Sequence, residues 1–185
     1  MMEQARALLD ELNGYSPADD AERGHLSEML ALLETSDPFS RGGFAPGHIT
    51  ASCFIIDPSG RVLLHHHRRL GRWLQMGGHV EPGETAAEAA LREGMEESGL
   101  RDLRLSSSGI LDLDVHDIPA ARGERDHRHF DVRYLARTCE PDAIMMDENE
   151  STRLAWVELA EAVSMMGTGE SGRVIAKIEK ALCRS

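Results

Sequence analysis

Cysteines, aromatic residues and long hydrophobic runs are all scarce in this sequence. Its three cysteines, among 185 residues, stand far apart and form no CxxC pair. This excludes a disulfide framework and favours a reducing compartment. No stretch approaches the roughly 20 apolar residues that a membrane-spanning helix needs. The acidic first residues lack the apolar segment of a secretory signal. These absences predict a cytoplasmic protein with no membrane partner.

Positive charge is also scarce, with 20 Lys and Arg against 32 Asp and Glu and a formal net charge of -12. Such a surface repels nucleic-acid polymers, so no polymer of this kind is expected as a partner. A small phosphorylated substrate remains compatible, because bound divalent cations can reverse the charge locally. The hydrophobic fraction of 41% and the length suffice for one sizeable core.

The first quarter of the chain is predicted to be mainly helical. Residues 2–14 and a segment from Pro17 to about Glu34 each have an apolar face, and Ser16 is the expected N-cap of the second helix. Residues 36–47 are rich in Gly, Pro and Ser and indicate a linker. We therefore expect an N-terminal helical extension and linker at 1–46 and a main domain at 47–185.

The main domain alternates between strand and helix patterns. A loop is expected at 68–83, a charged connection at 119–129, and helices at 84–98, ended by Gly99, and at 172–182. Without regular βαβ alternation, this order predicts a mixed α/β layer fold. Strands are expected at 48–56, 61–67, 103–115, 130–139 and 154–157.

Three carboxylates crowd one face of the helix expected at 84–98. Glu93, Glu96 and Glu97 occupy a sector about 100° wide, and like charges at these spacings destabilise a helix. Arg92 or a bound Mg²⁺ or Mn²⁺ ion could compensate, since hard divalent cations bind several oxygen ligands. For the glutamates alone, a solvated acidic face is the other interpretation.

The approach to this helix carries two glycines, Gly78 and Gly83, which permit a tight loop. Such a loop can turn a backbone carbonyl toward the same metal ions. Glu84 lies where the helix dipole favours a carboxylate, and it is within reach of Arg92. Glycines, arginine and carboxylates at these spacings shift the interpretation from a solvated face toward a metal site.

The segment from Gly78 to Leu100 resembles the Nudix box, G-x5-E-x7-R-E-U-x-E-E-x-G-U, where U is a bulky aliphatic residue. Eight of its nine defined positions match. Gly94 departs from it, which should weaken the helix by roughly 1 kcal/mol relative to Ala and remove a core contact; Met95 could partly substitute. Met76 departs from the proline that often precedes the paired glycines. Neither change affects a metal-binding carboxylate.

The resemblance implies a Nudix fold, in which a mixed β-sheet is sandwiched between helices (α/β/α), here with the extra N-terminal segment. It implies hydrolysis of a nucleoside diphosphate derivative, and possible homodimers. Glu93, Glu96 and Glu97 would hold one to three Mg²⁺ or Mn²⁺ ions, aided by the Gly78 carbonyl, and Arg92 would orient the carboxylates. The general base is either Glu96 or Glu97, or an acid of a later loop. The loop candidates are Asp147, Glu148 and Glu150.

Nine histidines are many for this length. His65 and His67 would share one face of a strand, and His127 and His129 alternate in the same way. A cluster could bind phosphate when protonated or a transition metal when neutral; scattered polar residues at strand edges are the other interpretation. His79 lies inside the box and is expected near the metal ions and the substrate.

Aromatic and basic residues precede the box. Trp73 could stack on a base or belong to the core, and Trp156 is expected in the core. Arg69, with Arg68 and Arg72, could contact substrate phosphates or lie in a solvated loop.

Two alternatives to a hydrolase remain open at this stage. A Nudix-fold module could sense a nucleotide without cleaving it, although the intact carboxylates argue against this. An isomerase acting on an isoprenoid diphosphate would need a cysteine near the site. Cys53 lies on an expected strand without a recognisable activating context.

Overall fold

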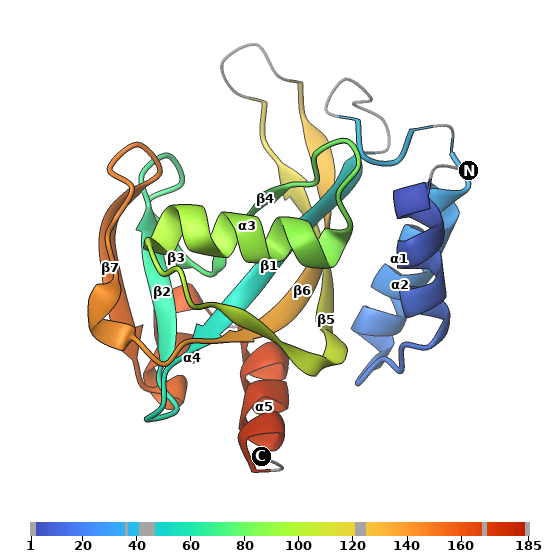
Figure 1. Ribbon diagram of the computed structural model, residues 1–185. Coiled ribbons are helices and arrows are strands. Elements are labelled where there is room, and N and C mark those ends of the chain that lie inside the picture. Colours follow the sequence, from blue (N-terminus) through green and yellow to red (C-terminus); the bar gives the residue numbers. More distant parts are fainter. Residues whose placement is uncertain (1–2, 36, 41–46, 121–124, 168–169, 184–185) are drawn as a thin grey trace.

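The computed structural model describes residues 3–35, 37–40, 47–120, 125–167 and 170–183. Seven strands form one mixed sheet, and helices cover both of its faces (Figure 1). The strands are β1 (His48–Ile56), β2 (Val62–His67), β3 (Arg72–Leu74), β4 (Met76–His79), β5 (Arg104–Ile118), β6 (His127–Arg137) and β7 (Ser151–Val157). The helices are α1 (Glu3–Asn13), α2 (Asp20–Leu33), α3 (Ala86–Ser98), α4 (Leu159–Met166) and α5 (Glu170–Leu182), with a 3-10 turn at Pro141–Ala143.

The sheet is organised around β1. One edge of β1 pairs in parallel with β6, which pairs in turn with β5. The other edge is forked. The first half of β1 pairs with β4, from Thr50 to Cys53, and its end pairs with β2 at Ile55 and Ile56. Beyond the fork, β2 pairs with both β3 and β7. The box helix α3 therefore follows a strand that is hydrogen-bonded directly to the centre of the sheet.

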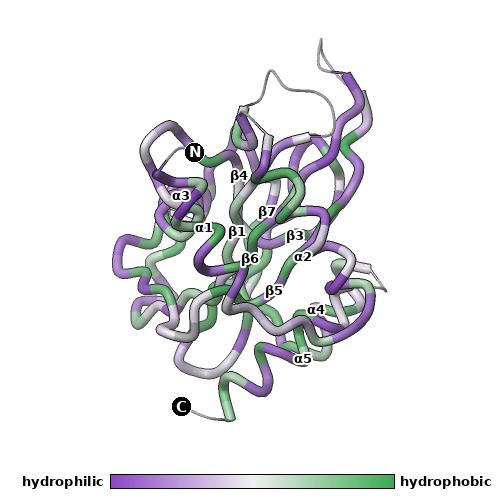
Figure 2. The backbone as a smooth tube through the Cα atoms, turned by 90° about the vertical axis from the view of Figure 1, so that its right-hand side faces the viewer, coloured by the Kyte–Doolittle hydropathy of each residue, from purple (hydrophilic) through white to green (hydrophobic). Residues whose placement is uncertain are grey.

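Alternate residues of β1 face two separate apolar cores. Ile49, Ala51, Cys53 and Ile55 belong to a core shared with α1, α2 and α3. Phe54 and Ile56 face the opposite way, into a core with α4 and α5. Figure 2 shows hydrophobic segments where β1 and β6 cross the centre of the molecule. The expected sheet between two helical layers is thus confirmed.

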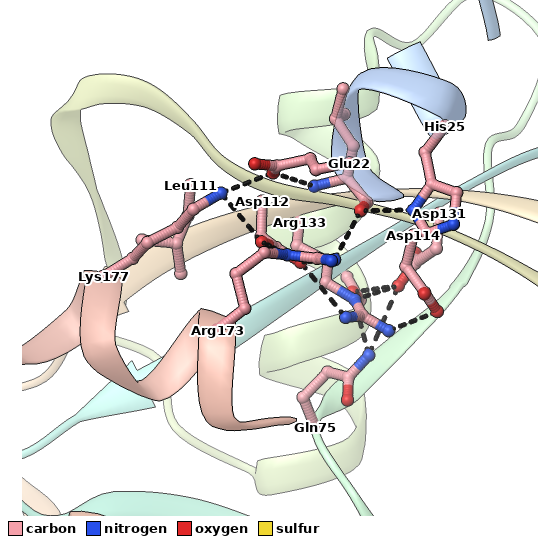
Figure 3. Close-up of polar contacts among 12 residues, drawn as sticks. Glu22, His25, Gln75, Leu111, Asp112, Asp114, Asp131, Arg133, Arg173 and Lys177 are labelled. Carbon is pink, nitrogen blue, oxygen red and sulfur yellow. Dashed lines mark hydrogen bonds and ion pairs between the residues drawn. The ribbon is translucent and has the colours of Figure 1, made fainter. Parts of the chain in front are cut away.

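A buried polar network joins the N-terminal helices to the main domain (Figure 3). Glu22 of α2 is fully buried; its carboxylate accepts hydrogen bonds from Lys177 of α5 and, at 3.1 Å, from the Leu113 amide. Asp112 is also fully buried and accepts from Lys177 at 2.8 Å and from Arg173 at 2.9 Å. The extension therefore packs against the sheet through buried charges as well as through apolar contacts.

Several expected boundaries were wrong for local reasons. The second helix begins at Asp20, because the Asp19 carboxylate, and not Ser16, accepts from the Glu22 amide at 2.8 Å. The segment 68–83 is not a single loop, since it contains β3 and β4. Short strands of mixed polarity carry little periodic signal.

Other boundaries moved by a few residues. The strand expected at 130–139 begins at His127, inside the expected connection 119–129, and the one expected at 154–157 begins at Ser151. Helix α4 was not expected at all. Most of the expected linker 36–47 lies outside the described residues. None of the helices within the described ranges is both long and apolar enough to cross a membrane.

Candidate active site

The box forms a loop and a helix that are fixed at both ends. Thr85 is the N-cap of α3, so this helix begins two residues later than expected. Its hydroxyl accepts from the Glu88 amide at 3.2 Å, and the Glu88 carboxylate accepts from the Thr85 amide at 2.8 Å. This reciprocal cap satisfies amides that the helix itself leaves open. At the other end Gly99 adopts φ 76°, which ends the helix as the sequence predicts.

Arg92 is the centre of the polar contacts of the box. Its guanidinium donates to Glu84 Oε1 at 2.7 Å and Oε2 at 3.1 Å, to Glu93 Oε1 at 2.8 Å and to Glu96 Oε2 at 3.1 Å. It also donates to the His79 carbonyl oxygen at 2.9 Å. Because the planar guanidinium has donors in fixed directions, these contacts set the orientation of the carboxylates and of the loop together.

The three carboxylates expected to bind metal differ in exposure. The Glu93 side chain is 16% exposed and that of Glu96 60% exposed, whereas Glu97 is buried. Glu97 accepts from the Gly77 amide at 3.0 Å. A Cβ atom at Gly78 would lie 2.5 Å from Glu93 Oε1. A side chain at this position of β4 would therefore displace the Glu93 carboxylate.

Anionic charge is concentrated around Glu97. Burial, together with the carboxylates of Glu93, Glu150 and Asp147, raises the pKa of Glu97 to about 8, against the opposing hydrogen bond from Gly77. Burial also raises the pKa of Glu93, although Arg92 opposes this. Such crowding of oxygen donors suits a divalent cation, which would relieve the repulsion.

The acidic loop before β7 lies beside the end of α3. The Met145 amide donates to the Ser98 carbonyl at 2.7 Å, which holds this segment against the helix. Of the three loop candidates, Asp147 and Glu150 act on the pKa of Glu97. Glu148 instead presents its backbone carbonyl to Arg68 Nε at 2.8 Å. The negative charges of Asp147 and Glu150 therefore act on the box carboxylate Glu97.

The residues expected to bind substrate lie in different parts of the structure, some beside the box and some away from it. His79 lies beside the box, and its carbonyl binds Arg92. Arg69 is exposed in the β2–β3 turn. Arg68 fastens the acidic loop, since its backbone amide also donates to the Glu150 carbonyl at 2.7 Å. Trp73 packs against the core that contains α4 and α5, and it meets the His66 ring edge-on with 5.4 Å between centroids. Trp73 thus makes a partly buried contact with this core.

Trp156 and Cys53 both contact the core that lies beneath α3. Trp156 packs against the core, as expected, and its ring donates to the Pro141 carbonyl at 2.9 Å. Cys53 is fully buried. Burial first, and then the carboxylates of Glu97, Asp131 and Glu93, raise the pKa of its thiol well above the ordinary value. This thiol lacks the exposure that an acid–base catalyst needs.

At Gly94, where the sequence departs from the box, a neighbouring residue fills the space of the missing side chain. A Cβ atom at Gly94 would lie 2.6 Å from Cys53 Sγ and 3.2 Å from Leu103 Cδ1. The volume that an aliphatic side chain would take is thus occupied by the Cys53 thiol. Met95 packs partly against the same core. The departure is compensated within the core and leaves the carboxylates in place.

Five histidine rings, that of His79 among them, form a cluster beside the box. They belong to β1, β4, β5 and β6, and adjacent rings lie 4.9 to 5.6 Å apart between centroids. Burial, reinforced by the four surrounding histidines, lowers the pKa of His129 to about 2. The sequence indicated His79, His127 and His129 but not His48 or His116, because only the strand pairing brings these two to the same place. The cluster consists of His48, His79, His116, His127 and His129.

Comparisons with known proteins identify the chain. The family model for the NUDIX domain matches residues 46–178. The chain belongs to the Nudix family. A probable DHNTP pyrophosphohydrolase of Lactococcus lactis is 27% identical over 138 residues, which cover 74% of this chain and 81% of that protein. The asymmetrical bis(5'-nucleosyl)-tetraphosphatase of Caenorhabditis elegans is 29% identical, over 60% of this chain and 75% of that protein.

The crystal structure of a C. elegans Ap4A hydrolase binary complex superposes with a TM-score of 0.60 at 23% identity, covering 74% of this chain and 98% of that one. At this identity the likeness concerns the fold. Together with the family match, the named relatives support one reaction class for this Nudix protein, the hydrolysis of a pyrophosphate bond in a nucleotide derivative.

Proposed function

We propose that this Nudix hydrolase requires Mg²⁺ or Mn²⁺ and acts on a small nucleotide with a chain of two or more phosphates. Glu93, Glu96 and Glu97 would bind the metal, aided by the Gly78 carbonyl. The observation that carries the proposal is the convergence of these carboxylates on one side of α3, where Arg92 orients two of them directly. The donor set consists of oxygen atoms, which Mg²⁺ and Mn²⁺ prefer over softer metals.

The chain's own residues have distinct roles in this proposal. Arg92 is a positioning residue, because it fixes the carboxylates and the loop carbonyl of His79 without being free to reach a substrate. Glu97 is the proposed proton acceptor, with Glu150 of the neighbouring loop as the second candidate. When bound, the metal ions would neutralise the diphosphate and make the attacking water more acidic.

The substrate class follows from chemistry and from the relatives. With a formal net charge of -12, the protein needs metal ions to receive a polyphosphate at all. The L. lactis relative is named for a pyrophosphohydrolase and the C. elegans relative for a tetraphosphatase. Both names concern small nucleotide-like compounds, and we propose the same class here. Arg69 is the proposed contact to the substrate, since the His79 ring is directed at His48, with 5.0 Å between the ring centroids.

The other two functions lose support. A sensor that does not cleave its ligand has no need of three intact carboxylates oriented by one arginine. An isoprenoid-diphosphate isomerase would need an accessible cysteine at the site, and Cys53 is sealed between β1 and α3.

The test is hydrolysis of a panel of compounds by the purified protein with Mg²⁺ or Mn²⁺. The panel contains nucleotide sugars, dinucleoside polyphosphates, ADP-ribose, NADH and oxidised nucleotides, and the products are separated by chromatography. Glu97→Gln should lower turnover of the best substrate at least about a hundredfold. Glu179→Gln, an exposed glutamate on α5, is the matched control and should keep wild-type turnover. Wild-type turnover in Glu97→Gln would reject the proposed role of this carboxylate.

A further inference from the structure

The five-histidine cluster lies on the sheet face that is opposite to α3. Residues paired across strands share one face of the sheet, and His48 pairs with His129, His129 with His116, and His79 with Thr50. The alternate residues of β1 on the other face belong to the core beneath α3. The rings therefore form a group of nitrogen donors that is separate from the carboxylates of the box.

Three members of the cluster have their ring nitrogens close enough to share one ion. One ligand atom from each of His48, His79 and His129 lies within 4.8 Å of the other two. In a tetrahedral zinc site with Zn–N bonds of 2.0–2.1 Å, the ligand nitrogens are about 3.3 Å apart. Small side-chain rotations, which bring the most distant pair closer by about 1.5 Å, would complete such a site.

The neighbouring rings supply a fourth ligand and outer support. His127 Nε2 lies 3.2 Å from His129 Nε2, and the other ring nitrogen of His127 lies 2.9 Å from the Arg125 carbonyl. Donation to that carbonyl leaves the Nε2 lone pair directed at the cluster. His116 Nδ1 is 2.8 Å from Asp114, which resembles the carboxylate–histidine pairs that orient metal ligands.

We propose that His48, His79 and His129, with His127 as the fourth ligand, bind one Zn²⁺ ion or another imidazole-preferring transition metal. This site is independent of the proposed Mg²⁺ or Mn²⁺ site, because all of its donors are nitrogens and those of the box are oxygens. Neutral imidazole is the form of histidine that binds metals, whereas binding of phosphate would require protonated rings.

The ion would also support the box. His79 follows Gly78 directly, and its carbonyl accepts from Arg92 at 2.9 Å. An ion that joins His79 to β1 and β6 would therefore fix the end of β4 from which the box loop starts. Since the ion binds the folded chain, it should raise the unfolding temperature by an amount that grows with the logarithm of its concentration relative to Kd.

Binding is tested with Zn²⁺ and Co²⁺ on the full chain. Metal-free protein is dialysed against about 1 µM Zn²⁺, and the bound metal is measured by mass spectrometry; Co²⁺ is followed through the visible absorption of its four-coordinate complex. We expect one Zn²⁺ per chain, retained in excess Mg²⁺, and a higher unfolding temperature. His48→Asn and His129→Gln, made separately, should each weaken binding at least about tenfold.

Two controls separate this site from the box. His66→Gln lies outside the cluster and should bind Zn²⁺ like the wild type. The triple variant Glu93→Gln, Glu96→Gln, Glu97→Gln should also bind Zn²⁺ like the wild type. Zinc binding can therefore be tested even if the protein hydrolyses none of the compounds in the panel. Far-UV circular dichroism without metal checks that each variant folds. The proposal is overturned if folded His129→Gln retains full affinity, if the triple variant loses the ion, or if the wild type binds no Zn²⁺.

Discussion

The contact between Gly94 and Cys53 allows a quantitative test of the packing beneath the box helix. On helix propensity alone, Gly94→Ala should stabilise the protein by about 1 kcal/mol. The structure predicts the opposite, because the new methyl group would lie 2.6 Å from Cys53 Sγ, in a core where Cys53 is 0% exposed. Overpacking of this kind costs about 1–3 kcal/mol. The expected net effect is a destabilisation of up to about 2 kcal/mol.

A double-mutant cycle isolates the cause. In a Cys53→Ala background the thiol is gone, so Gly94→Ala should recover its helix propensity and stabilise the chain. The coupling energy between the two changes should then be about 1–3 kcal/mol. The free energy of unfolding of all four proteins is measured by urea denaturation, with equal m-values as the check that the unfolded states are comparable. Stabilisation by Gly94→Ala in the wild-type background, or additivity within about 0.5 kcal/mol, would refute the packing argument.

Three further predictions concern other parts of the molecule. Arg92→Lys should lower turnover by roughly tenfold to a hundredfold with little change in KM, because an ammonium cannot orient several carboxylates and a carbonyl at once; steady-state kinetics measure this. Asp112→Asn should cost roughly 3–5 kcal/mol in urea unfolding, since it removes a buried negative charge that Arg133, Arg173 and Lys177 share, whereas the exposed Asp117→Asn should cost almost nothing. Burial, reinforced by His67, lowers the pKa of His65 to about 4, so the folded state resists protonation that the unfolded state accepts below about pH 6.5. Protonation linked to His65 should thus lower stability by about 2 kcal/mol from pH 7 to pH 5, and His65→Gln should reduce the pH dependence by that amount; an unchanged pH profile in this variant would contradict the assignment.

The box could be predicted from the sequence because its signals are local. Helix α3 combines strong helix formers, a capping threonine and a terminal glycine, and spacing alone places Glu93, Glu96 and Glu97 on one side. The pairing of Glu84 with Arg92 was foreseen for the same reason. These contacts span at most one or two helical turns, so they depend little on the rest of the fold.

The features that escaped prediction depend on strand pairing. His48 and His129 are 81 residues apart and meet only because β1 and β6 run in parallel with a particular register. Asp112, Arg173 and Lys177 look like surface charges in the sequence, yet they form a buried network between β5 and α5. A single sequence contains no signal for register between distant strands, and for this reason the partners of these charges could not be named.

At the forked edge of β1, Gly77 of β4 determines the position of the whole box. A Cβ atom at Gly77 would lie 2.3 Å from the Ser52 side chain on the paired strand. If β4 slipped by one residue so that Met76 lay opposite Ser52, a side chain would have to occupy this spot, and the start of the box loop would be displaced by about 3.3 Å. The close contact between Gly77 and Ser52 therefore fixes the pairing of β4 with β1. Through this pairing it also fixes the position of the loop and helix that are proposed to bind a polyphosphate.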